Sequence, residues 1–468
     1  MEAAIILVFA MGYLAITLEH SLRIDKLIPA LIMMALCWAL IAFGLDSFAQ
    51  WFDSGEHNLL ESFGLMNYQE KMDLMEETLL HHLGKTSEIL VFLLGAMTIV
   101  EIIDYFDGFS TIKSFVKTKN KVKILWIFSI LAFILSAIID NLTATIVLIS
   151  ILQKIVKDRD VRLWYAGLII IAANAGGAWS PIGDVTTTML WIGKKVTTGH
   201  LIGYLFFPSF LCMAIPSLIA SFLPAFKGDL EVDDTQEVSK SKFSSTMLYL
   251  GLGAIVFVPI FKMITHLPPY VGMMLSLGVV AVFAEIYSNS NFSMTQFHSE
   301  ESDAHAHHSP VHYSLSKIEL PSILFFLGIL MAVASLESLG ILFDFAGILQ
   351  ETMPMLGTEL HYSYEPQGGV SDIVVLLLGV ASAVIDNVPL VAASLGMFHE
   401  PIDNELWHFI AYSAGTGGSM LIIGSAAGVV AMGMEKINFF WYLRKIAWLA
   451  LVGFLVGAAA FMFTRTLF

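Results

Sequence analysis

Long apolar runs separated by short polar stretches dominate the pattern along this chain. The first four cover residues 3–18, 27–43, 89–103 and 124–139, and several more follow toward the C-terminus. Each run approaches the roughly 20 residues that an α-helix needs to cross the hydrocarbon core of a bilayer. The pattern therefore predicts an all-α polytopic membrane protein.

The composition agrees with this interpretation. Of the 468 residues, 57% are hydrophobic and 14% are charged, and the mean hydropathy is +0.76. Soluble domains carry about 25% charged residues. The first apolar run is preceded by Glu2 and not by a basic segment. We therefore expect that run to be a retained span and not a signal peptide. The two cysteines, Cys37 and Cys212, lie in apolar runs and indicate neither a disulfide framework nor a cysteine metal site.

The distribution of lysine and arginine sets the expected orientation. Residues 113–123 contain five lysines, which places this loop on the cytoplasmic side by the positive-inside rule. The next basic cluster, residues 154–162, belongs on the same side, so the apolar segment between them enters and returns as a hairpin with Asp140 and Asn141 at its turn. Lys194 and Lys195 fall outside and are the exception.

The chain also contains an internal repeat. Residues 92–95 resemble 325–328, residues 136–141 (Ser-Ala-Ile-Ile-Asp-Asn) resemble 382–387 (Ser-Ala-Val-Ile-Asp-Asn), and the glycines at 176, 177 and 183 match those at 417, 418 and 424. In the predicted topology the two copies enter from opposite sides. We therefore expect two inverted-topology repeats with helical hairpins and discontinuous transmembrane helices, an architecture of secondary transporters.

Four regions follow from the repeat. Residues 1–86 are expected to form N-terminal scaffold spans and an acidic outer loop, and 87–225 the first inverted repeat with its hairpin and broken helix. Residues 226–317 are expected to supply a linker, two scaffold spans and a histidine-rich cytoplasmic loop, and 318–468 the second repeat.

Two segments look like interrupted spans. Residues 164–191 are long enough to cross the bilayer, yet Asn174 to Asp184 in the middle contain three glycines and Pro181, which unwind a helix. Irregular backbone at this depth is tolerated only inside protein or beside water, where freed carbonyls can coordinate a cation. Residues 413–428 repeat the pattern, with Ile422 and Ser425 in place of the proline and the acid.

Carboxylates inside these segments are the candidate functional groups. An ionised residue at bilayer depth costs on the order of 2.5 to 3.5 kcal/mol, so each marks a functional site. A buried carboxylate holds either a hard cation or a proton, and this competition couples two fluxes. Asp140 and Asp184 are the expected shared ligands, and the supporting ion- and proton-binding residues are expected to be Asn141, Asn174, Thr186, Thr187, Asp386, Asn387, Ser413 and Thr416.

Other titratable residues have a less defined role. Four of them lie near predicted span ends: His20, Glu101, Asp104 and Glu337. They are interpreted either as part of a proton path or pH sensor, or as ordinary solvated residues. Five histidines cluster at positions 298, 305, 307, 308 and 312 in a polar loop. A linker without fixed structure is the favoured interpretation of that loop, with metal binding or pH sensing as the alternatives.

Three motifs carry a family resemblance. Residues 138–145 (Ile-Ile-Asp-Asn-Leu-Thr-Ala-Thr), 172–188 and 385–389 resemble the NhaD-type sodium/proton antiporters of the ion transporter superfamily. The resemblance implies exchange of Na⁺ or Li⁺ for H⁺ across the cell inner membrane by a homodimer with an elevator-like motion. The arsenite, citrate and dicarboxylate carriers of the same superfamily commonly have Ser-Asn-Thr at the hairpin tips. In this chain Asp140 and Asp386 occupy the position of that serine.

Two alternatives remain from the sequence. An organic-anion or arsenite carrier of the same superfamily would need positive helix ends and hydroxyls around its substrate. A membrane enzyme is not expected, because the sequence has no His-Glu-x-x-His run, Gly-x-Ser-x-Gly elbow or phosphate loop. Neither a cofactor nor a nucleic-acid partner is expected.

Overall fold

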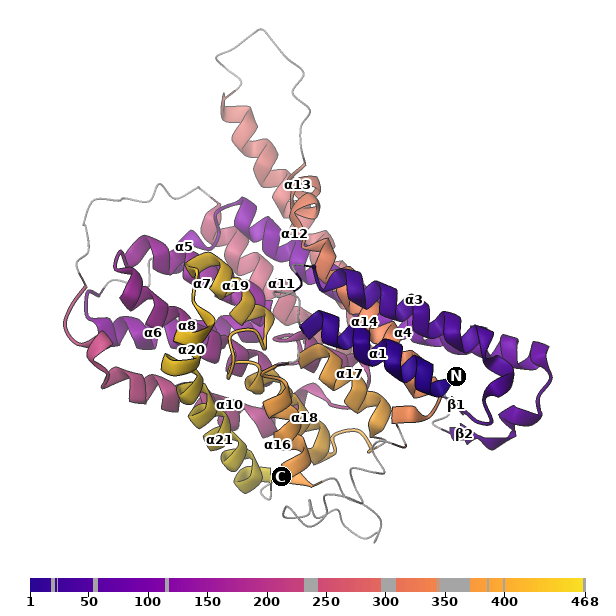
Figure 1. The fold of residues 1–468 in the computed structure, drawn as a ribbon. Helices are drawn as coiled ribbons and strands as arrows, with labels where there is room; N and C mark the ends of the chain where they lie inside the picture. Colours follow the sequence, from indigo (N-terminus) through magenta and orange to yellow (C-terminus); the bar gives the residue numbers. More distant parts are fainter. Residues whose placement is uncertain are drawn as a thin grey trace.

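The computed structural model describes residues 1–17, 22, 24–53, 58–113, 118–230, 243–295, 309–342, 344, 371–384, 387–398 and 400–465. Figure 1 shows that helices fill most of this part of the chain. The helices of the first half are α1 (Glu2–Thr17), α3 (Leu27–Phe43), α4 (Tyr68–Tyr105), α5 (Ser110–Lys113), α6 (Lys121–Ile139), α7 (Asn141–Ile155), α8 (Arg159–Ala178), α9 (Val185–Ile192) and α10 (Thr198–Ser221).

The second half continues the helical pattern. Its helices are α11 (Ser244–Thr265), α12 (Pro269–Thr295), α13 (Pro310–Lys317), α14 (Leu320–Ser338), α16 (Asp372–Ala381), α17 (Asn387–Met397), α18 (Glu405–Gly417), α19 (Ala426–Glu435), α20 (Phe439–Lys445) and α21 (Ala447–Thr464). Short 3₁₀ turns are η1 (Leu45–Ser47), η2 (Glu61–Leu65) and η3 (Pro224–Phe226), and strands β1 (Trp51–Asp53) and β2 (Asn58–Leu60) form one small antiparallel pair.

Among the described residues, eight helices are long and apolar enough to cross a membrane: α4, α6, α8, α10, α11, α12, α14 and α21. Six more apolar helices have 10–17 residues, α7, α17 and α19 among them. Short apolar helices are expected where hairpins or breaks divide a span. The prediction of an all-α polytopic membrane protein is confirmed.

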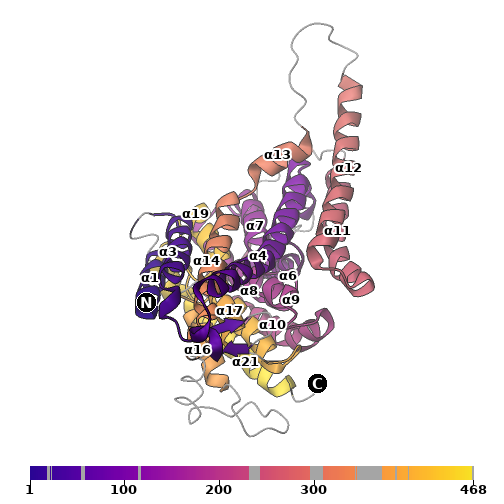
Figure 2. The ribbon, with the colours of Figure 1, turned by 90° about the vertical axis from the view of Figure 1, so that its right-hand side faces the viewer.

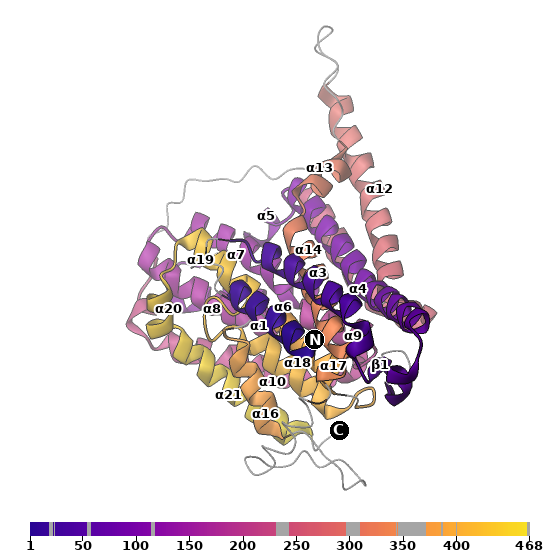
Figure 3. The ribbon, with the colours of Figure 1, turned by 45° about the vertical axis from the view of Figure 1, so that its right-hand side comes forward.

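The helices pack in two groups. In the α4 group, α14 packs on α3 and α4, α12 packs on α4 and α11, and α1 packs on α3. In the hairpin group, α8 packs on α6, α7 and α10, α16 packs on α18, and α10 packs on α21. Figure 2 shows α11 and α12 standing to one side of the remaining helices, and Figure 3 shows α20 and α21 on the opposite side from α12. The groups meet chiefly where α14 contacts α17, where α11 contacts α6 and where α4 contacts α9.

The structure corrects the expected outer loop before the third span. Its second part is helical, because α4 begins at Tyr68 and continues unbroken to Tyr105. Asn67 caps this helix by accepting a hydrogen bond from the N–H of Glu70, and the Glu70 carboxylate accepts one from the N–H of Asn67 in return. This reciprocal pair satisfies two N–H groups that a helix start leaves open.

Both expected helix breaks are present, although the first is shorter than predicted. α8 stays helical through Asn174 and ends at Ala178, and residues 179–184 connect it to α9. α18 ends at Gly417, and residues 418–425 connect it to α19. Asn174 therefore lies within α8 and not in the unwound stretch.

The two halves repeat the same contacts between hairpin and broken helix. The hydroxyl of Ser136 donates to the carbonyl of Ala173 at 2.6 Å, and the hydroxyl of Ser382 donates to the carbonyl of Ala414 at 2.8 Å. Added methyl groups at the paired glycines 176 and 417 would overlap the carbonyl oxygens of residues 133 and 379, respectively. Each broken helix thus lies directly against the backbone of its hairpin.

This close approach leads to a stability prediction. Gly417→Ala places a methyl group against a backbone carbonyl that has no rotamer to change, so we expect a loss on the order of 1–3 kcal/mol and a lower melting temperature of the solubilised protein. Gly253→Ala on α11 is the control, because nothing lies within 4 Å of its added methyl group. Equal melting temperatures for the two variants would contradict the packing described here.

Candidate functional site

Hydroxyl side chains hold the backbone at the two breaks. In the first, Thr187 donates to the carbonyl of Asp184 at 2.9 Å, and Thr188 donates to the carbonyl of Pro181 at 2.9 Å. In the second, Ser419 donates to the carbonyl of Thr416 at 2.6 Å. Thr188 thereby satisfies a carbonyl inside the first break, whereas the carbonyls of Asp184 and Thr416 also accept the backbone N–H groups of Thr188 and Ser419, respectively.

Asparagines of the first half meet a serine of the second half. Asn141, the first residue of α7, donates through Nδ2 to Oδ1 of Asn174 at 3.0 Å, and Nδ2 of Asn174 donates to Oγ of Ser425 at 3.0 Å. Asn174 is fully buried, and the other two are nearly so. The polar group therefore joins a hairpin tip, the C-terminal part of α8 and the N-cap of α19.

An equivalent contact joins the first break to the second hairpin. Asn387, the first residue of α17, donates through Nδ2 to Oδ2 of Asp184 at 2.9 Å. Asp184 is 3% exposed and caps α9, with its Oδ1 3.4 Å from the N–H of Thr186. The absence of a side chain at Gly415 leaves room beside this carboxylate, since an added methyl group would lie 3.7 Å from Oδ2.

Asp140 uses its carboxylate differently from Asp184. Its Oδ1 accepts the N–H of Thr143 at 2.8 Å, and its Oδ2 accepts the hydroxyl of Thr143 at 3.0 Å. The backbone of Asp140 has φ 82° and ψ 160°, a conformation that costs a non-glycine residue about 1–3 kcal/mol and that occurs mainly at functional sites. The two expected shared ligands therefore lie in separate hydrogen-bond clusters.

Three buried hydroxyls near the clusters have no hydrogen-bond partner in the described part of the chain. They belong to Thr145 on α7, Thr186 on α9 and Ser413 on α18. Thr145 lies one turn after Asn141, which places both residues on the same side of α7. The hydroxyl of Thr416, in contrast, donates to the carbonyl of Tyr412 in its own helix at 2.6 Å.

The other predicted residues do not join these clusters in the described structure. Glu101 and Asp104 lie near the end of α4 and interact with each other and, for Glu101, with Lys317. Glu337 lies at the end of α14, where its carboxylate faces Gly396 of α17. Asp386, His20 and the histidines at 298, 305, 307 and 308 fall outside the described residues, whereas His312 lies in α13.

Sequence reasoning missed part of the arrangement. Ser425, which takes the place of the acid in the second break, was not among the predicted site residues, yet it bonds Asn174 directly. Its position, 241 residues after Asp184, was the available signal, because Gly183 and Gly424 have the same spacing. The hydroxyl of Thr143, which was not among the predicted site residues, bonds the side chain of Asp140.

The chemistry of these clusters suits a hard cation. Amide, hydroxyl and carboxylate oxygens are ligands for such ions, and carbonyls at the ends of half-helices add to them. Within the residues described, no group of three or more His, Cys, Asp or Glu side chains is arranged to hold a metal ion. Most of the oxygens belong to amides and hydroxyls, and Asp184 contributes the carboxylate that bonds the opposite hairpin.

Comparisons with known proteins agree on the family. Residues 6–408 match a family model described as "Citrate transporter". The chain is 39% identical over its whole length to sodium/proton antiporter 1 of Arabidopsis thaliana, covering 73% of that protein, and 35% identical to sodium/proton antiporter 2 of the same plant, with 97% of this chain and 98% of that protein covered. It is 30% identical to the Na⁺/H⁺ antiporter NhaD of Vibrio cholerae, over 97% of this chain and 90% of that protein.

A solved structure supports the fold alone. The YdaH transporter of Alcanivorax borkumensis, whose topology is called unusual, matches with a TM-score of 0.60 at 12% identity, over 94% of this chain and 98% of that chain. The sequence matches, each extending over most of the chain, decide the classification. The chain matches the citrate transporter family model and belongs to the NhaD-type antiporters.

Proposed function

We propose that this protein exchanges Na⁺ or Li⁺ for protons by alternating access across the cell inner membrane. The observation that carries the proposal is the contact between Asp184 and Asn387, a buried carboxylate at a helix break bonded to the opposite hairpin. The names of the relatives, sodium/proton antiporters, support the choice of ions.

Competition at Asp184 provides the coupling. A deprotonated carboxylate there is a strong ligand for Na⁺, with the oxygens of Asn387, Thr186 and Ser413 as neutral partners. A protonated carboxylate has lost the charge that attracts the cation. One site that holds either a proton or a cation, and that opens to each side in turn, moves the two in opposite directions. The proposed cation site also includes the side-chain oxygens of Asn141, Asn174 and Ser425.

Asp140 is the proposed relay toward one entrance. A small cavity of about 140 Å³ lies between the two helix groups next to the hairpin tip, and it is lined by residues that include Leu142, Asp25 and Glu319. Glu319 interacts electrostatically with Asp140. In the proposed orientation this entrance is cytoplasmic. Lys26 also lines it, so its charge is mixed, and Glu319 is the acid proposed to pass protons to the tip.

The moving parts follow from the packing groups. We assign the hairpin group, which holds both clusters, as the mobile transport domain, and the α4 group as the scaffold of a homodimer. The inverted repeat gives the two hairpins opposite directions, so a displacement of the hairpin group exposes one hairpin tip and covers the other. This elevator-like motion is consistent with the limited contact between the groups.

The family description favours a second candidate, an organic-anion carrier. Such a substrate would meet the carboxylate of Asp184 inside the site, and two like charges repel strongly where water is excluded. We therefore place cation exchange first. Transport of citrate would require Asp184 to be protonated throughout the cycle.

Ion-dependent proton flux tests the function. In inverted membrane vesicles, Na⁺ and Li⁺ should each drive proton movement, whereas K⁺ and citrate should not. Because protons compete for the carboxylate, the Na⁺ concentration for half-maximal exchange should rise as the pH falls, by up to about tenfold per pH unit for one competing proton. A response to citrate alone, or an Na⁺ requirement that does not change with pH, would overturn the proposal.

A substitution of the carboxylate tests the site. Asp184→Asn keeps the size and the helix cap but removes the charge, so it should abolish Na⁺-driven proton movement while the protein stays in the membrane. Asp158→Asn is the matched control, because Asp158 caps the exposed start of α8 and undergoes the same chemical change. Normal exchange in Asp184→Asn, or equal losses in both variants, would contradict the assignment.

The contribution of the second half is tested at Ser425. Ser425→Ala removes the acceptor of the Asn174 amide, and we expect a roughly tenfold higher Na⁺ concentration for half-maximal exchange, the equivalent of about 1.4 kcal/mol. Ser394→Ala is the control, since this buried serine bonds only the carbonyl of Leu390 in its own helix among the contacts described. Unchanged Na⁺ dependence in Ser425→Ala would remove this residue from the site.

A further inference from the structure

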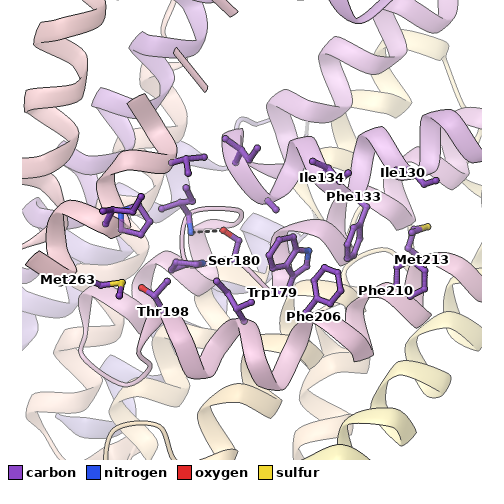
Figure 4. A pocket seen from close by; sticks show the side chains of 18 residues that line it. Ile130, Phe133, Ile134, Trp179, Ser180, Thr198, Phe206, Phe210, Met213 and Met263 are labelled. Carbon is purple, nitrogen blue, oxygen red and sulfur yellow. Dashed lines mark hydrogen bonds between the residues drawn. The ribbon is translucent and has the colours of Figure 1, made fainter. Parts of the chain in front are cut away.

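An apolar cavity of about 530 Å³ separates the two helix groups behind the first break. Its walls come from α6, from α10, from Trp179, Ser180 and Pro181 of the break, and from α11. Figure 4 shows that the cavity is elongated, with Met263 and Thr198 at one end and Ile130 and Met213 at the other. The long shape and the apolar lining fit a hydrocarbon chain.

The cavity opens onto the outer surface of the protein. Among its lining residues, Ile134 of α6 is 51% exposed and Met263 of α11 is 64% exposed. In a membrane-spanning protein, apolar side chains on the outside of such helices face lipid. The bilayer therefore supplies the hydrocarbon chain that can enter.

A pair of lysines lies at the end marked by Thr198 and Met263. Lys262 neighbours Met263 on α11, and its Nζ donates to the carbonyl of Trp191 at 3.0 Å and lies 4.1 Å from the centre of that indole ring. Lys194 is exposed, lies three residues after Trp191, and its charge acts on Lys262. Lys195 points elsewhere, with its Nζ 4.6 Å from the ring centre of Trp407.

We propose that this cavity and these lysines form a binding site for a bilayer phospholipid with an anionic headgroup. The acyl chain fills the apolar cavity, and the headgroup phosphate lies against Lys194 and Lys262. Lys194 is one of the two lysines that the positive-inside rule does not expect at this end of the spans, and a headgroup phosphate gives its charge a partner there.

The position of the lipid gives it a regulatory role. One wall of the cavity, α11, belongs to the α4 group, and the other walls belong to the hairpin group. A bound lipid therefore lies between the proposed scaffold and the proposed transport domain, where it sets how easily they slide. This regulatory role rests on the proposed function, whereas the binding of lipid does not.

Native mass spectrometry of the full-length protein with dioleoyl phosphatidylglycerol or dioleoyl phosphatidylcholine tests the site. We expect preferential binding of phosphatidylglycerol and an about fivefold loss in Lys194→Gln, the size expected for one lysine at an anionic headgroup. Lys195→Gln is the charge control and should bind normally. No preference between the lipids, or equal binding by both lysine variants, would overturn the proposal.

The cavity is tested separately from the charge. Val256→Phe on α11 should fill it and reduce phosphatidylglycerol binding, whereas Val279→Phe on α12 is a control of the same size change at a similar exposure, 42% against 41%. Melting temperatures show whether Val256→Phe folds. If it does not fold, the binding of phosphatidylglycerol by Lys194→Gln decides whether the lipid site exists. Unchanged binding in a folded Val256→Phe protein would show that the acyl chain does not enter this cavity. These binding results stand even if the ion exchange assay fails.

Discussion

The need to satisfy backbone hydrogen bonds away from water governs this structure. Two helices stop at Ala178 and Gly417, and each leaves carbonyls that hydrocarbon cannot satisfy. The chain meets this need with nearby hydroxyls, such as Thr188 on the carbonyl of Pro181, and with distant ones, such as Tyr442, whose hydroxyl donates to the carbonyl of Ser419 at 2.7 Å. Unwound backbone is thereby kept inside protein and away from hydrocarbon.

The same constraint explains the close packing around the breaks. The hairpins must lie against the broken helices to exclude lipid, and only glycine allows the backbones to approach at residues 176 and 417. Ser136 and Ser382 then reach a carbonyl across each interface. The clusters of Asn141 and Asp184 form at these interfaces, so their rigidity depends on the packing that surrounds them.

Much of this arrangement was predictable from the sequence, because glycine and proline act locally. The spans, the turn at Asp140 and both breaks followed from composition and spacing. The start of α4 could also have been found, since Asn67 and Glu70 have the spacing of a capping box. The hydrogen-bond partners of the buried polar groups could not be predicted. The bond between Asn174 and Ser425, for example, depends on how elements 251 residues apart pack together. The bonds of Asp140 to Thr143 are local, in contrast, and have the spacing of an N-cap.

Both polar clusters combine residues from the two halves of the chain. Asn174 meets Ser425, Asp184 meets Asn387, and at the periphery both carboxylate oxygens of Glu435 accept from the Nε of Arg162, at 2.8 and 2.9 Å. Neither half therefore contains a complete cluster. Although the halves repeat each other, they are not free to diverge independently, since a change on one side of a pair alters the environment of its partner. Evolutionary drift in one copy of the repeat is constrained by the other.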